Sequence, residues 1–108
     1  MTDTPSQPED CPPAPVPDGP LWREVPIINK KGLHARATAK FVQCVDRFEA
    51  AITVSRCGET VNGNSIMGIL TLGAGMGSSI TITASGPEAE QALSALCTLV
   101  ADRFGEHE

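Results

Sequence analysis

Aromatic side chains are scarce in this sequence, which contains no Tyr, one Trp and three Phe among 108 residues. An excess of positive charge is also missing, because 13 acidic residues outnumber eight Lys and Arg and leave a formal net charge of −5. Proteins that bind nucleic acid usually need a basic surface for the phosphates and aromatic rings on which bases stack. We therefore expect no nucleic-acid partner.

Long apolar runs are absent as well. A membrane-spanning helix needs roughly 18 or more apolar residues, and no segment approaches that length. The N-terminus has neither the basic start nor the apolar stretch of a signal peptide. We expect a cytoplasmic protein that does not bind membranes. The four cysteines lie far apart and show no CxxC or Cys/His spacing, so we expect no metal site, and no cofactor loop is apparent.

Proline is plentiful but concentrated near the N-terminus. Seven of the nine prolines lie between Pro5 and Pro20, and residues 1–22 carry four acidic residues and no Lys or Arg. Such a segment buries too little apolar surface to offset the entropy of ordering it. We expect residues 1–22 to form a disordered acidic arm, residues 23–104 to form one domain, and residues 105–108 to form a flexible tail.

From Arg23 onward the apolar pattern alternates between the strand period and the helix period. The resulting order, β-α-β-β-α-β-α, predicts an α+β fold of the open-faced sandwich type. In it a four-stranded antiparallel sheet is covered on one face by three helices. The expected strands are 24–29, 52–55, 60–62 and 79–84, and the expected helices are 35–47, a short one from Ser65, and one from Ser85 or Gly86 to about Arg103.

The glycines at positions 73, 75 and 77 indicate a flexible connection between the short helix and the last strand. At the final helix, two starts fit the sequence equally well. Either Ser85 caps the helix together with Glu88, or Gly86 caps it with Pro87 at the first helical position.

Only two histidines are present, and they differ in setting. His107 lies in a charged tail and is expected to be solvated, whereas His34 follows Gly32 at the start of the first predicted helix. An imidazole is a good nucleophile near neutral pH, because its ordinary pKa is about 6.5. Unpaired N–H groups of a first helical turn attract an anion, and a guanidinium such as that of Arg36 binds phosphate oxygens in a forked geometry. Spacing alone leaves open that His34 merely caps the helix or faces solvent.

Two longer motifs favour a nucleophilic role for His34 over a role as a helix cap or a solvent-facing residue. Residues 32–42 read GLHARATAKFV, and residues 64–70 read NSIMGIL. Together they resemble HPr, the histidine-containing phosphocarrier family of the bacterial phosphoenolpyruvate-dependent phosphotransferase system. The resemblance covers about residues 23–104, with both motifs in the expected order.

This resemblance implies specific roles. His34 would form a phosphohistidine at Nδ1, taking the phosphoryl group from Enzyme I and passing it to an Enzyme IIA-type protein, and Arg36 would steady the phosphate. Ser65 matches the family's regulatory serine, which a serine kinase/phosphorylase modifies in some bacteria. Ile66 and Met67 would face partners, while Ile69 and Leu70 would turn toward the core. The partner-binding residues implied in this way are Ile66, Met67, Leu70 and Lys40.

The chain departs from the family pattern at two places. Ala37 stands where many members have proline, and this alanine resembles the nitrogen-related regulatory branch of the family. Most members also lack the N-terminal arm. We expect a monomeric relay component rather than a free-standing enzyme. The alternative functions are a non-catalytic regulatory module that has kept the fold and a small-molecule-binding regulatory domain of similar layout. A relic module would be free to lose His34 and Arg36, and this chain has both.

Overall fold

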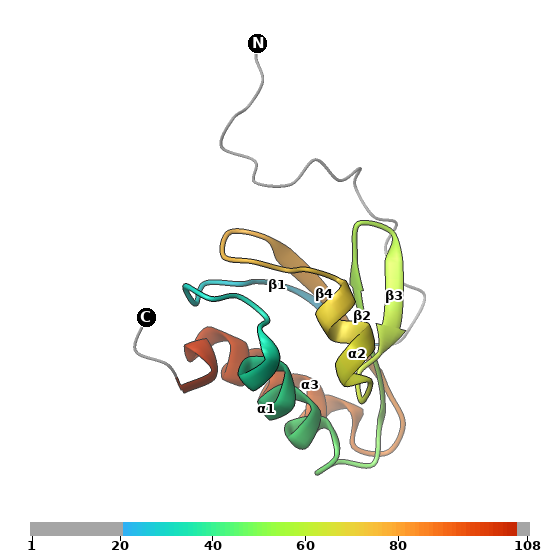
Figure 1. Cartoon of the computed structure of the whole chain (residues 1–108). Helices are drawn as coiled ribbons and strands as arrows, with labels where there is room; N and C mark the ends of the chain where they lie inside the picture. The colour runs from blue at the N-terminus through green and yellow to red at the C-terminus, as the bar shows by residue number, and fades with distance from the viewer. Residues whose placement is uncertain (1–20, 106–108) are drawn as a thin grey trace.

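The computed structural model describes residues 21–105 of the chain. Strands and helices follow one another in the predicted order (Figure 1). The elements are β1 (Leu21–Pro26), α1 (Ala35–Val45), β2 (Ala51–Arg56), β3 (Glu59–Asn62), α2 (Ile66–Thr71), β4 (Ser79–Ser85), α3 (Ala89–Ala101) and a one-turn 3₁₀ segment, η1 (Arg103–Gly105).

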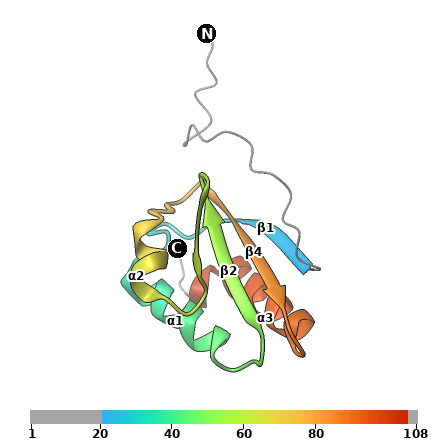
Figure 2. The ribbon, with the colours of Figure 1, turned by 90° about the vertical axis from the view of Figure 1, so that its right-hand side faces the viewer.

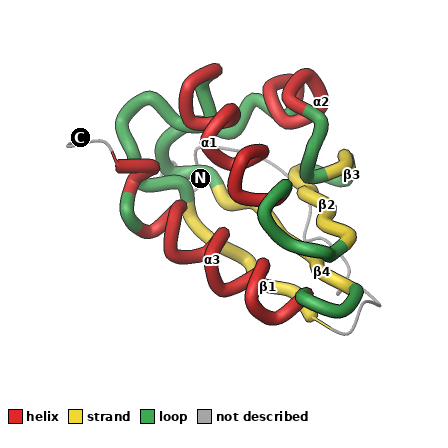
Figure 3. Tube along the Cα trace, turned by 90° about the horizontal axis from the view of Figure 1, so that it is seen from below, coloured by secondary structure: helices red, strands yellow, loops and turns green. Residues whose placement is uncertain are grey.

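The four strands form a single antiparallel sheet in the order β1-β4-β2-β3. Figure 2 looks onto the strands of this sheet, with β2, β4 and β1 side by side and α3 behind them. In Figure 3 the helices lie together on one side and the strands on the other. The predicted α+β open-faced sandwich is therefore confirmed.

The core lies between the sheet and the helices. Along β4 the side chains alternate, so that Ile80, Ile82 and Ala84 are buried while the threonines between them are partly exposed. From the helical side, Phe41 of α1 and Leu96 of α3 reach into the same core with no exposed surface. Burial of this apolar surface, worth about 25 cal/mol per Å², is what holds the helices on the sheet.

The first strand was predicted wrongly at 24–29. Leu21 and Trp22, which we expected in the arm, belong to β1 and pair with Ala84 and Thr83 of β4. This long-range pairing leaves no local pattern in the sequence, whereas the apolar pair Ile27 and Ile28 imitates a strand. Residues 1–20, the rest of the expected arm, lie outside the described residues.

Two helix boundaries also differ from expectation. The first helix ends at Val45 rather than 47, because Asp46, Arg47 and Phe48 form tighter turns whose amides bond to carbonyls three or four residues earlier. At α3, neither predicted cap is used: Glu88 is the N-cap residue, and its carboxylate accepts a 2.7 Å hydrogen bond from the backbone N–H of Glu49. A contact between distant segments therefore sets this helix start.

Gly105, which we expected in the tail, belongs to η1, and residues 106–108 lie outside the described residues. No helix within residues 21–105 has the length and apolar character needed to cross a membrane. In the same range, no three His, Cys, Asp or Glu side chains gather closely enough to hold a metal ion.

Candidate functional site

His34 is the N-cap residue of α1. Its backbone is extended, with φ −78° and ψ −179°, and its carbonyl accepts the first helical hydrogen bond from the N–H of Thr38 at 2.8 Å. The imidazole is half-buried and, within the described part of the chain, makes no capping bond to the helix. The amides of residues 35–37 precede that first helical bond and point toward the helix start, where a helix attracts anions.

Gly32 brings the chain into this helix start through a tight turn. Its φ is +65°, a left-handed conformation that side chains other than glycine disfavour. A Cβ at this position would lie 2.6 Å from both the carbonyl oxygen of Ala74 and the Cα of Gly75. The next amide, that of Leu33, donates a 2.8 Å hydrogen bond to the same Ala74 oxygen. Two backbone segments therefore touch at Gly32 and Leu33, directly before His34 in the chain.

The segment that meets this turn is residues 73–78, the connection between α2 and β4. The glycine spacing predicted a flexible link, but the structure holds it by several hydrogen bonds. The Gly77 N–H donates to the Ile27 oxygen at 2.9 Å, and the Ile27 N–H donates to the Ser78 oxygen at 2.8 Å. The hydroxyl of Ser78, a residue only 3% exposed, donates to the Gly75 oxygen at 2.6 Å.

Two further side chains, which sequence reasoning missed, support these loops. Asn29 is fully buried and donates from Nδ2 to the carbonyl oxygen of Gly32 at 2.8 Å. Arg56, at the end of β2, donates from Nη1 to the carbonyl oxygen of Leu72 at 2.8 Å, just where α2 ends and the 73–78 segment begins. Nothing in the local pattern around Arg56 indicates this contact, because its partner lies 16 residues away.

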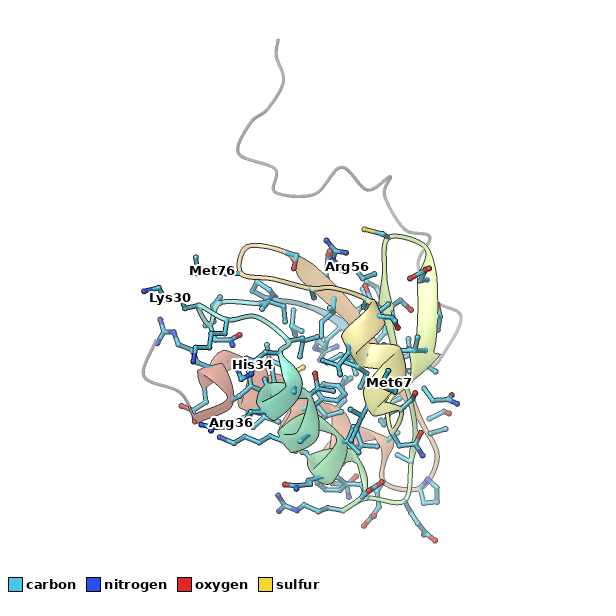
Figure 4. The ribbon with its side chains drawn as sticks, in the orientation of Figure 1. Lys30, His34, Arg36, Arg56, Met67 and Met76 are labelled. Carbon is cyan, nitrogen blue, oxygen red and sulfur yellow. The ribbon has the colours of Figure 1, made fainter. Side chains whose placement is uncertain are left out.

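Positive charge gathers around the helix start. Lys30, Lys31 and Arg36 are exposed, and residues 25–45 contain no acidic side chain. In Figure 4, Lys30, His34 and Arg36 lie along the same side of the domain. Arg36 lies in the first turn of α1, two residues after His34.

Lys40 makes an internal contact, whereas we expected it to bind partners. Its ammonium donates a 2.6 Å hydrogen bond to the carbonyl oxygen of Phe104, at the C-terminal end of the domain. The residue is partly buried, so this contact ties α1 to η1. A role for Lys40 in partner binding remains a prediction that has to be compatible with this internal bond.

Ser65 caps α2, because its hydroxyl accepts a 3.0 Å hydrogen bond from the N–H of Gly68. A Cβ at Gly68 would lie 2.9 Å from that hydroxyl and 3.0 Å from the Cβ of Val61, so the cap and the contact with β3 both depend on glycine. The helix packs beside α1.

The expected orientation of the α2 side chains is confirmed. Ile66 and Met67 are 43% and 71% exposed, Ile69 is fully buried, and Leu70 is half-buried. In Figure 4, Met67 lies on the opposite side of α1 from Arg36. The site residues therefore form two groups, one around His34 and one on α2, and α1 lies between them.

The site around His34 lies on the surface. A shallow groove does run between α1 and α3, with Lys40, Cys44, Leu99 and Asp102 among its lining residues, but His34 is not one of them. The arrangement around His34 can bind an anion at a helix start beside a guanidinium, and it leaves the other side of that anion open to a second molecule.

Comparisons with known proteins agree with this geometry. Residues 22–102 match the family model described as the PTS HPr component phosphorylation site. The chain is 48% identical to the phosphocarrier protein HPr of Cupriavidus necator over 88 residues, which are 82% of this chain and 99% of that protein. It is 42% identical to the phosphocarrier protein NPr of Shewanella violacea over 86 residues, which are 80% of this chain and 94% of that protein.

Solved structures of HPr proteins are also similar to this chain in fold. The crystal structure of HPr from Thermoanaerobacter tengcongensis superposes with a TM-score of 0.79 at 40% identity, covering 82% of this chain and 99% of that one. That of HPr from Bacillus anthracis gives a TM-score of 0.70 at 49% identity, covering 72% of this chain and 93% of that one. The fold, the helix-start histidine and these likenesses show that the chain belongs to the HPr family of phosphocarrier proteins of the phosphotransferase system.

Proposed function

We propose that His34 carries the phosphoryl group, accepting it at Nδ1 from Enzyme I and passing it to an Enzyme IIA-type protein. The observation that carries this proposal is the position of His34, an imidazole at the N-terminus of α1 that is not used to cap the helix. In the first transfer the Nδ1 lone pair forms a bond to phosphorus as the bond between phosphorus and the donor atom breaks. In the second transfer the acceptor atom forms a bond to phosphorus as the bond between phosphorus and Nδ1 breaks, and the electron pair of that bond returns to Nδ1.

The surrounding groups stabilise charge during the transfer. The amides at the start of α1 and the guanidinium of Arg36 face the phosphoryl oxygens, where negative charge is concentrated. Fixed donors are effective because they need no reorganisation at the moment of reaction. Gly32, held against Ala74 and Gly75, positions the backbone that presents the imidazole.

Partners supply the rest of the active site around His34. Ile66 and Met67 offer exposed apolar contacts, Leu70 contributes its accessible edge, and the cations around His34 steer acidic partners. Such an interface has to form with two different proteins in turn, which favours a small patch and a weak, transient contact. We place this relay in the cytoplasm, and we propose that the protein acts as a monomer.

Incubation with phosphoenolpyruvate and Enzyme I tests the proposal directly. The parent protein should acquire an acid-labile phosphoryl label, and His34→Ala should acquire none. His107→Ala is the matched control, because it removes the only other histidine and should label at the parent rate. Labelling of His34→Ala would refute the assignment and would indicate a different acceptor, whereas a parent protein that takes up no label would favour a non-catalytic module.

Ser65 is proposed as a regulatory phosphorylation site for a serine kinase/phosphorylase. A phosphate there would add about two negative charges beside Ile66 and Met67. The added charge would oppose docking through repulsion of acidic partners and through the cost of desolvating the phosphate. The hydroxyl also caps α2, so the residue serves stability and regulation together.

A further inference from the structure

Opposite charges are concentrated in two separate parts of this chain. Residues 1–20 contain four acidic side chains and no Lys or Arg, and residues 25–45 contain four Lys or Arg and no acidic side chain. The acidic residues are Asp3, Glu9, Asp10 and Asp18, and the cations are Lys30, Lys31, Arg36 and Lys40.

Three of these cations are exposed beside His34. Lys30, Lys31 and Arg36 face solvent, whereas Lys40 is partly buried and bonds to the Phe104 oxygen. Lys30 and Arg36 lie on the same side of the domain as His34 (Figure 4). These three residues, the cation cluster, therefore form the surface that an acidic partner would meet first.

The acidic segment is long enough to reach this surface. It precedes Leu21, the first residue of β1, and the described structure measures 47 Å along its longest axis. Proline-rich chain spans roughly 3.1 Å per residue, so 20 residues can extend about 60 Å. Because the segment is covalently attached, its effective concentration at the cluster is in the millimolar range.

We propose that residues 1–20 bind the cation cluster and compete there with acidic partner proteins. The contact is electrostatic and weak, since exposed ion pairs contribute little individually and are screened by salt. Its consequence is a lower apparent affinity for partners at low ionic strength, with no change in the chemistry at His34. The effect on partners rests on the proposed phosphocarrier function, but the contact itself does not.

The contact can be measured without any partner, by comparing backbone amide chemical shifts of two full-length proteins. One is the parent, and the other carries Asp3→Asn, Glu9→Gln, Asp10→Asn and Asp18→Asn, which keeps the length and the prolines. At about 20 mM salt the amides of Lys30, Lys31 and Arg36 should differ between the two, and at about 0.5 M salt the difference should vanish because the screening length falls to a few ångströms. The amide of Ile69, which is fully buried in α2, serves as the internal control.

The second experiment measures transfer from Enzyme I to the same two proteins. At low salt the neutral-arm protein should show a KM about two- to fivefold lower with unchanged kcat, the size expected for a few screened ion pairs. Adding Lys30→Gln and Lys31→Gln to both proteins should reduce the difference, because only Arg36 of the cation cluster is then left for the arm to bind.

The outcomes separate the two proposals. Identical amide shifts at low salt would overturn the arm contact, even if His34 transfers phosphate normally. Amide shifts that differ in a protein that cannot be labelled at His34 would leave the contact intact and remove the phosphocarrier assignment. Slower transfer after neutralising the arm would show recruitment of partners and would overturn competition.

Discussion

The ammonium of Lys40 donates a 2.6 Å hydrogen bond to the carbonyl oxygen of Phe104, joining α1 to a segment 64 residues later. Phe104 sits in an unusual turn, because Arg103, Phe104 and Gly105 all have positive φ values of 55°, 55° and 78°. Left-handed backbone at non-glycine residues costs about 1–3 kcal/mol each and persists only where the surroundings hold it. The buried ring of Phe104 and the bond from Lys40 are the contacts that do so.

We expect Lys40→Ala to lower the free energy of unfolding by about 1–2 kcal/mol, because a hydrogen bond from a charged donor to a partly buried carbonyl is lost. Lys31→Ala, which removes an exposed cation of the same type, should change stability by less than about 0.5 kcal/mol. Urea unfolding of the two variants makes the comparison. Equal stability of both would mean that the bond to Phe104 contributes nothing in solution.

Gly32→Ala should destabilise the protein and slow transfer together. The left-handed φ costs about 1–3 kcal/mol for a non-glycine residue, and the added methyl group must also displace backbone atoms 2.6 Å away. Gly75→Ala is the control on the facing loop, since a Cβ there meets no described atom within 4 Å and should cost less than about 0.5 kcal/mol. Urea midpoints and labelling rates of both variants test this. If the two alanines behave alike, the close approach at Gly32 does not constrain the site.

At Ser65, stability and transfer should respond differently to two substitutions. Ser65→Ala removes the cap of α2 and should cost about 1 kcal/mol of stability with little effect on transfer. Ser65→Asp keeps a capping oxygen but adds charge next to Met67, so it should raise KM for Enzyme I. Ser94→Asp places the same charge on the exposed side of α3 and controls for net charge. Normal KM in Ser65→Asp would remove the case for regulation through charge.

The thiols of Cys44 and Cys97 should make the free energy of unfolding depend on pH. Burial raises the pKa of Cys44 above its ordinary value of 9.0, with the cation of Arg47 acting in the opposite direction. Burial likewise raises the pKa of Cys97 above 9.0, opposed by Arg23. The unfolded chain therefore loses these protons first as pH rises, which makes the unfolded state bind fewer protons than the native one.

The thiol contribution to stability is thus fully present below about pH 8 and is lost as pH rises past about 9. Urea unfolding at pH 7, 8.5 and 10 should show this decline. In Cys44→Ala/Cys97→Ala, the decline should be smaller, although the absolute stability is lower from lost packing. The same slope in parent and double variant would show that other groups cause the decline.

Much of the fold could be predicted from local pattern, because apolar periodicity and turn residues act over a few neighbouring positions. Ile80, Ile82 and Ala84 alternate in the sequence and are buried in the sheet, and Ser65 stands where a cap for α2 is needed. The elements that were mispredicted depend on distant partners. Trp22 joins the sheet through Thr83, and α3 begins where Glu88 meets Glu49.

The candidate site likewise contains some residues that the sequence could predict and others that it could not. His34, Arg36 and the apolar residues of α2 could be proposed from two contiguous motifs, and the structure shows His34 at the start of α1 and Ile66 and Met67 exposed on α2. The contacts that hold the loops could not be predicted: Arg56, Asn29 and the 73–78 segment act through backbone carbonyls, which carry no residue-specific signal.

By itself, then, the sequence determined the order of the elements, the family motifs and the segregation of charge between residues 1–20 and 25–45, because each is written in neighbouring residues. Tertiary structure alone decided that Ala74 lies against Gly32 and that Lys40 is engaged by Phe104. Both contacts join segments far apart in the chain, and packing of the helices on the sheet is what brings those segments together.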